Sequence, residues 1–173
     1  LEGTYPLPEA QLDRFMFEIV LDYLPEDEEL AVVQATTGPA AAGLQAIISR
    51  DRLIDYQRLT RRVTVADDVA RYAVQVARAS RPGTPAAAQA AQRWLTYGAS
   101  VRAAQYLVLA GKARALTQGR VHVGFDDVRA LARPVLRHRL LRNFQAESEQ
   151  VSVDSLVDEL LASVTPQRQR GTA

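Results

Sequence analysis

The sequence predicts a mainly α-helical protein with a single strand-like segment near its start. Aromatic residues make up only 6% of the chain, and alanine-rich windows with helical spacing dominate it. Residues 153–164 carry one continuous apolar stripe, which is typical of an amphipathic helix. Residues 15–21 are instead a nearly unbroken apolar run of strand length, as found in strands buried on both faces of a parallel sheet. No comparable strand follows, so we expect the chain to be a piece of a larger protein.

Helices are expected in order along the first third of the chain. A short helix over 8–15 has Pro8 near its first turn. The next helix begins at Pro25, because the four acidic residues that follow complement the positive end of the helix dipole. That helix ends by Gly38-Pro39. A linker over 38–46 and a helix over about 50–62 complete this part.

In the rest of the chain, the sequence predicts four longer helices. The first covers 66–80 and is capped by Asp67, with apolar residues at helical spacing. A helix over 101–117 follows Ser100 as its N-cap and is ended by Gly119. The remaining expectations are a short strand over 121–123, a helix from Asp126 or Asp127 that Pro134 breaks or kinks, the helix over 153–164, and a disordered tail over 166–173.

Composition excludes several classes of protein. The absence of cysteine removes disulfide scaffolds and thiolate chemistry, and His122 and His138 lack ligand spacing, so no metal site is predicted. The net charge of +1 favours neither nucleic acid nor a membrane surface as partner. No apolar run approaches the ~20 residues of a membrane span. All but one of the 21 basic residues are arginine, which indicates a GC-rich, bacterial genome, and we expect a cytoplasmic protein.

Common enzyme motifs are missing from the sequence. It has no G-x-G-x-x-G, no nucleophile elbow and no phosphate-binding loop of the G-x-x-x-x-G-K-[ST] type. Gly111-Lys112 is followed by alanine, and position 106 is tyrosine, so this segment is not a remnant of such a loop. The chain alone therefore cannot hold a triphosphate.

Arg102 occupies an unusual position for a cation. It lies in the first turn of the 101–117 helix, where the dipole disfavours positive charge by up to about 1 kcal/mol. A helix N-terminus with an arginine is a common way to hold phosphate oxygens. An ion pair with a nearby acid, or screening by solvent, also explains the residue, and from spacing alone we favour this interpretation. Arg14 has a similarly plain interpretation, in which it pairs with Asp13.

Residues 129–142 hold five arginines and His138 without an acid. One hypothesis is a helical module that binds DNA through this segment. The other is a solvated face, or a patch that pairs with the acidic 26–29 turn in this or a neighbouring subunit; a plain helical adaptor domain is a third hypothesis. We favour the second, because no base-stacking aromatic residues are interleaved.

Three motifs in order resemble the MoxR family of AAA+ ATPases. Residues 3–15, read GTYPLPEAQLDRF, resemble the end of that family's ATPase core. Residues 98–103, GASVRA, resemble its sensor-2 motif, although Val101 stands where the family usually has proline. Residues 119–128 and 135–139 resemble its C-terminal signature. The likeness extends from Gly3 to about Val164.

The resemblance implies a division of the chain and a role for two arginines. Residues 1–22 would be the last helix and strand of an αβα core, 23–165 a helical AAA+ lid bundle, and 166–173 a tail. Arg14 matches the catalytic arginine finger, which reaches the γ-phosphate bound by the neighbouring subunit. Arg102 matches the sensor-2 arginine, which contacts the nucleotide of its own subunit.

The resemblance also implies partners. ATP and Mg²⁺ would be bound mainly by a core upstream of Leu1 that carries Walker A, Walker B and sensor 1, so this chain alone should be inactive. The whole protein would form a homo-oligomeric ring, often a hexamer. It would mature a client protein in a chaperone-like way or insert a metal cofactor, and the client could carry a von Willebrand A-type domain.

Overall fold

The structure of the chain is a computed structural model that describes residues 7–38, 43 and 45–167. The chain divides into two units. The larger unit combines Leu1–Glu18 with Leu59–Ala173, and the smaller unit is Ile19–Arg58. Most of the predicted linker and tail, and the first residues of the first motif, lie outside the described residues.

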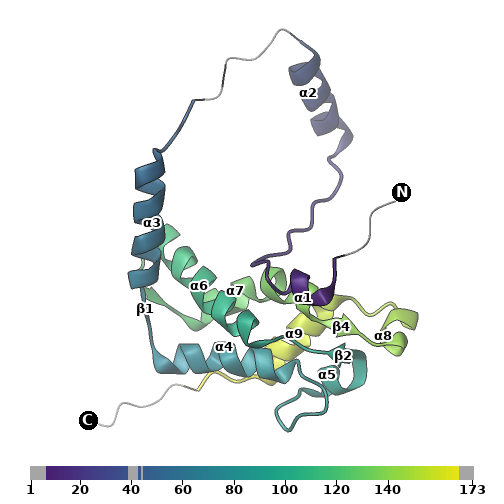
Figure 1. Cartoon of the computed structure of the whole chain (residues 1–173). Helices are drawn as coiled ribbons and strands as arrows, with labels where there is room; N and C mark the ends of the chain where they lie inside the picture. Colours follow the sequence, from purple (N-terminus) through teal and green to yellow (C-terminus); the bar gives the residue numbers. More distant parts are fainter. Residues whose placement is uncertain (1–6, 39–42, 44, 168–173) are drawn as a thin grey trace. The chain divides into compact units, whose positions relative to one another are not determined.

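The larger unit is built around one long helix. This helix, α6 (Val101–Thr117), packs against α4 (Asp67–Ala79) and α7 (Phe125–Leu136), as Figure 1 shows. A fourth long helix, α9 (Val153–Ser163), contacts α4 and α7. The shorter elements are α1 (Glu9–Leu12), α5 (Gln89–Trp94), the 3₁₀ turn η1 (Arg137–Arg139) and α8 (Phe144–Ser148). The described residues are therefore mainly α-helical, as predicted.

Two short strand pairs tie the connections of this unit together. β1 (Thr64–Val65) lies parallel to β3 (His122–Val123), with Thr64 opposite His122. β2 (Leu95–Tyr97) lies antiparallel to β4 (Leu141–Arg142). Only the strand near 121–123 was expected from the sequence, because pairs of two or three residues leave too short a pattern to detect.

The core confirms the helical faces read from the sequence. Leu156, Val157 and Leu160 of α9 are buried, and the remaining apolar residues of that stripe pack against the core. The face predicted for the 66–80 helix is buried in full, and its members are Val69, Tyr72, Ala73, Val76 and Ala77. Burial of these side chains contributes to the apolar core that stabilises the unit.

Helix ends agree with the sequence at two places and differ at a third. Ser100 caps α6 as expected, since its Oγ accepts a hydrogen bond from the Arg102 amide. Pro25 precedes α2 (Glu26–Thr37), whose first turn is acidic. The N-cap of α4 is Ala66, so the prediction of Asp67 as the cap is wrong, and Asp67 is the first helical residue. Helix α3 covers Arg50–Arg62, as predicted.

Helix α7 runs through Pro134 and ends two residues later at Leu136. The chain then tightens into the 3₁₀ turn η1, which places three basic side chains, those of Arg137, His138 and Arg139, in consecutive positions. This turn positions the site described below.

Residues 15–21, predicted as a strand of a sheet that this chain lacks, form no strand in the structure. No strand is assigned to these residues, because no neighbouring strand offers them a hydrogen-bonding edge. The Glu18 amide instead donates to the Pro134 carbonyl at 2.8 Å. The side chains of Ile19, Val20 and Leu21 are exposed. An apolar run without a sheet therefore remains unpaired, as the missing partner strand requires.

Within the described part of the chain, no helix has both the length and the apolar character needed to cross a membrane.

Candidate functional site

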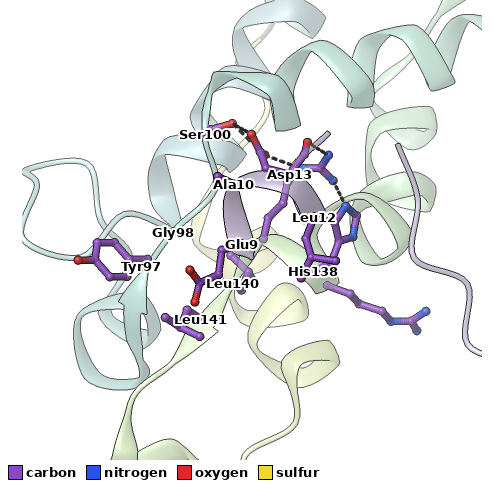
Figure 2. A pocket seen from close by; sticks show the side chains of 12 residues that line it. Glu9, Ala10, Leu12, Asp13, Tyr97, Gly98, Ser100, His138, Leu140 and Leu141 are labelled. Atoms are coloured by element: carbon purple, nitrogen blue, oxygen red, sulfur yellow. Dashed lines mark hydrogen bonds and ion pairs between the residues drawn. The ribbon is translucent and has the colours of Figure 1, made fainter. Parts of the chain in front are cut away.

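Asp13 is the centre of a polar cluster that joins α1 to α6 and η1. It follows the last residue of α1. Its carboxylate accepts hydrogen bonds from Ser100 Oγ at 3.0 Å, from Arg102 Nη1 at 2.5 Å and from Arg139 Nε at 3.0 Å. Figure 2 shows Asp13 facing Ser100 across the cluster. Two residues far apart in sequence, in α6 and η1, thus converge on one carboxylate.

The ion pair with Asp13 accounts for the unusual position of Arg102. The first turn of α6 contains no acidic residue of its own. The negative charge that compensates the positive end of the helix dipole therefore comes from Asp13, outside the helix. The interpretation of Arg102 as the partner of a nearby acid is confirmed. Its side chain stays 39% exposed, which leaves guanidinium nitrogens free to meet an anion from solvent.

The loop before α6 is fixed by a close backbone contact at Gly98. A Cβ atom at this position would lie 2.0 Å from the Ser80 carbonyl oxygen, so only glycine fits. The Ala99 amide donates to the buried Ser80 Oγ at 2.8 Å, and Arg81 Nε donates to the Ala99 carbonyl at 2.8 Å. These contacts set where α6 begins, and hence where Ser100 meets Asp13.

Arg139 is a buried arginine whose side chain is only 1% exposed. Besides its bond to the Asp13 carboxylate, its Nη2 donates to the Asp13 carbonyl at 2.7 Å and to the Phe15 carbonyl at 2.5 Å. Its Nη1 donates to the Val135 carbonyl and contacts His138 Nε2. A buried guanidinium is tolerated only when its donors are satisfied, and here all three nitrogens have acceptors.

Burial and hydrogen bonding shift the pKa values in this cluster. Burial alone would raise the pKa of Asp13, but the hydrogen bonds from Ser100, Arg139 and Arg102 outweigh it and lower that pKa. Burial lowers the pKa of Arg139, although Asp13 opposes the shift. Burial also lowers the pKa of His138, and the positive charge of Arg139 acts in the same direction. Asp13 is therefore an anion, and we expect His138 to be neutral, at neutral pH.

Arg14 contacts the rest of the unit through its backbone and not through its side chain. Its carbonyl oxygen accepts a hydrogen bond of 2.8 Å from the Tyr106 hydroxyl. Its side chain is exposed and has no ion pair or hydrogen bond within the described residues. The interpretation that Asp13 pairs with Arg14 is wrong, because the Asp13 oxygens are taken by Ser100, Arg102 and Arg139.

A cavity of about 500 Å³ adjoins the cluster. Its walls come from α1, from the β2 end with Gly98, and from η1 with the first residue of β4. Asp13 and Ser100 line one side, and Tyr97 and Leu141 line another, as Figure 2 shows. The cavity therefore offers a mainly apolar space beside a charged rim.

The arginines of residues 129–142 are paired within the unit. Arg129 pairs with Asp126, Arg133 with Asp158 and Arg137 with Asp154, while Arg142 donates to the Val151 carbonyl. Arg139 belongs to the Asp13 cluster. The acids that pair with these arginines lie directly after α1 and in α7 and α9. Each arginine of this segment thus has a partner within the unit.

Sequence reasoning found Arg14, Asp13 and Arg102 but missed Arg139, Tyr106 and Ser80. Arg139 lay within a segment treated as a solvated face, and its burial has no local signal. Tyr106 and Ser80 act through backbone carbonyls and amides of distant segments, which a sequence pattern does not reveal.

Comparison with known proteins relates the chain to AAA proteins. Residues 87–160 match the family model of the AAA lid domain. The chain is 33% identical over 165 residues to Chaperone MoxR1 of Mycobacterium tuberculosis, covering 94% of this chain and 43% of that protein. It is 31% identical to Protein MoxR of Paracoccus denitrificans, covering 94% and 52%. A crystal structure of a candidate ATPase from Cytophaga hutchinsonii superposes with a TM-score of 0.88 at 33% identity, over 96% of this chain and 51% of that one.

Residues 87–160 thus carry an AAA lid domain. The resemblance to the MoxR family that the sequence indicated is confirmed, because MoxR-named relatives match 94% of the chain. The chain spans about half the length of the curated relatives that it matches.

Proposed function

We propose that this chain supplies the lid and the arginine finger of an AAA+ ATPase that works as a ring. In this proposal residues 1–22 end the ATPase core, 23–165 form the lid, and the nucleotide-binding motifs lie elsewhere in a longer polypeptide. The length of the MoxR relatives and the absence of a phosphate-binding loop from this sequence support that division. The chain by itself is then expected not to hydrolyse ATP.

The observation that carries the proposal is the contrast between the backbone of Arg14 and its side chain. Its backbone is held by the lid through Tyr106, while its side chain is exposed and unpaired among the described residues. A cation kept free of internal partners on a fixed backbone is suited to meet an external anion. Arg14 is therefore proposed as the catalytic finger that contacts the γ-phosphate held by a neighbouring subunit.

Arg102 is proposed as the sensor-2 arginine, which contacts the nucleotide of its own subunit. Asp13 contacts Arg102 directly and precedes Arg14 in the chain, so Asp13 links the two arginines.

The residues present fit the anionic part of such a nucleotide. Arginine nitrogens can donate paired hydrogen bonds to phosphate oxygens, and the N-terminus of α6 adds backbone donors. ATP and Mg²⁺ supply phosphoryl transfer, in which negative charge spreads over the transferred group. Arg14 and Arg102 would stabilise that charge. The family resemblance assigns the Mg²⁺ ion to the core.

The cellular role is proposed from the family. Chaperone MoxR1 is named as a chaperone, which supports chaperone-like maturation of a client protein by this chain's parent protein. Assembly as a hexameric ring, insertion of a metal cofactor and a client with a von Willebrand A-type domain belong to the same proposal. A cytoplasmic location also belongs to it.

The test is ATP hydrolysis by the full-length protein, comparing the native form with Arg14→Ala and Arg102→Ala. Loss of an arginine finger costs about 10³-fold or more in turnover, so Arg14→Ala should nearly abolish hydrolysis while nucleotide binding persists. Arg58→Ala is the matched control, because Arg58 is exposed and pairs only with Asp55 three residues away. Native turnover by Arg14→Ala would refute the proposal.

A further inference from the structure

Three consecutive carbonyl groups around Arg14 are held by two lid side chains. Arg139 Nη2 binds the carbonyls of Asp13 and Phe15, and the Tyr106 hydroxyl binds the carbonyl of Arg14 between them. The arrangement leaves no carbonyl of residues 13–15 without a lid donor. The backbone from which the Arg14 side chain projects is therefore fixed on both sides and at its centre.

The two donors also support each other. The Arg139 guanidinium lies over the Tyr106 ring, with its Cζ atom 5.1 Å from the ring centroid, in a cation–π contact. Arg139 is buried and its nitrogens are saturated with acceptors, so its position is well determined. Tyr106 lies on α6, one turn after Arg102. A shift of α6 or η1 would consequently move the Arg14 backbone with it.

We propose that Tyr106 and Arg139 are positioning residues for Arg14. They orient the finger from the lid, so that lid position and finger position change together. The inference rests on the proposed function of Arg14 and deepens it. Charge stabilisation of a transition state depends steeply on geometry, and loosening a supporting contact lowers turnover without removing the cation itself.

Tyr106→Phe is the sharpest variant, because it deletes one hydroxyl and keeps the ring that Arg139 covers. Tyr23→Phe is the matched control, since Tyr23 is 93% exposed and its hydroxyl makes no hydrogen bond in the described part of the chain. Both changes are made in the full-length protein, alone and combined with Arg14→Ala. The readouts are kcat and KM for ATP hydrolysis and the melting temperature.

In the native background we expect Tyr106→Phe to lower kcat about three- to tenfold, the equivalent of one net hydrogen bond, with KM and melting temperature unchanged. In the Arg14→Ala background the same change should have no effect, because nothing remains to be positioned. An equal fold-loss in both backgrounds, or no loss in the native one, would overturn the inference. Native turnover by Arg14→Ala alone would instead remove the proposed function, so the two failures are distinguishable.

Arg139→Lys extends the test to the second donor. A lysine ammonium cannot span the Asp13 and Phe15 carbonyls as the guanidinium does, so a larger kcat loss is expected. Because Arg139 is buried, this variant also loses folding stability. The comparison of Tyr106→Phe in the native and Arg14→Ala backgrounds therefore decides whether the lid positions Arg14.

Discussion

The hydroxyl of Tyr106 donates a hydrogen bond of 2.8 Å to the carbonyl oxygen of Arg14, across 92 positions of the chain. This contact joins a lid helix to the residue that follows α1 and Asp13. Together with the Asp13–Arg102 ion pair, it attaches the end of α1 to the rest of the larger unit. Four predictions on the stability and binding of this unit follow from its polar contacts.

Asp127 should be indispensable for folding of the larger unit. Its side chain is 1% exposed and binds Arg114 and Arg120, and it also accepts from the Gly124 amide. Hydrogen bonding from Arg120 lowers the pKa of Asp127 far below its usual range. Asp127→Asn leaves two arginines without their anion, and we expect a loss of about 3–5 kcal/mol in the free energy of unfolding.

The measurement for Asp127 is urea denaturation of this chain. Asp126→Asn is the control, because Asp126 is 90% exposed and pairs only with Arg129 three residues away. Equal stability of the Asp127 and Asp126 variants would contradict the structural role assigned to the buried carboxylate.

Gly98→Ala should disrupt the start of α6. The added methyl group would overlap the Ser80 carbonyl oxygen, and backbone on both sides must move to relieve the overlap. We expect a cost of about 3 kcal/mol, at the upper end for overpacking. Gly43→Ala has no atom within 4 Å of the new methyl group and serves as the control. Thermal melting of both variants checks the prediction, and a native melting temperature for Gly98→Ala would refute it.

The stability of the unit should fall as pH drops below about 6.5, and His138 should be the cause. Burial lowers its pKa from 6.5, so the unfolded chain binds this proton at a higher pH than the folded one. Its stabilising contribution is therefore complete above the unfolded pKa and is lost as pH falls toward the folded pKa. Arg139 faces the ring at 2.6 Å and opposes its charge, while Glu18 at 3.9 Å only partly offsets this.

Urea denaturation between pH 5 and 8 measures this effect. His138→Gln should flatten the dependence in that range, and His122→Gln, which changes an exposed side chain, should preserve it. A slope that survives in His138→Gln would assign the pH dependence to another group.

The chain should not bind duplex DNA. The arginines of residues 129–142 are already engaged by carboxylates or carbonyls of the same unit. Binding through phosphates requires free cations and weakens steeply with salt. Fluorescence anisotropy with labelled duplex at low salt is expected to show no binding. Saturable binding that disappears with added salt would restore the DNA-binding hypothesis.

Local patterns were sufficient to predict the helices and their buried faces. The 3.6-residue spacing on α4 and α9 reflects burial of one face, which is a property of neighbouring residues in the sequence. The position of Ser100 as N-cap is equally local. Residues 15–21 form no strand here because a strand needs a partner, and hydrogen bonds to a neighbour are not encoded in the segment's own apolar pattern.

The candidate site was predicted only in part for the same reason. Arg14 and Arg102 were found through a family resemblance, and Asp13 was named with the wrong partner. The true partners of Asp13 lie 87, 89 and 126 positions away, so the choice among competing arginines is made by tertiary packing. Arg139 could be distinguished from the surface arginines near it only through its burial.

The central claim is that Arg14 acts on a nucleotide held by the neighbouring subunit, and mixing of subunits tests it most directly. Full-length Arg14→Ala would be mixed with a full-length variant whose own core cannot bind nucleotide but whose Arg14 is intact. Each should be nearly inactive alone, and the mixture should recover ATP hydrolysis, because intact fingers then meet intact nucleotide sites in the same ring. A mixture no more active than its separate components would contradict the account.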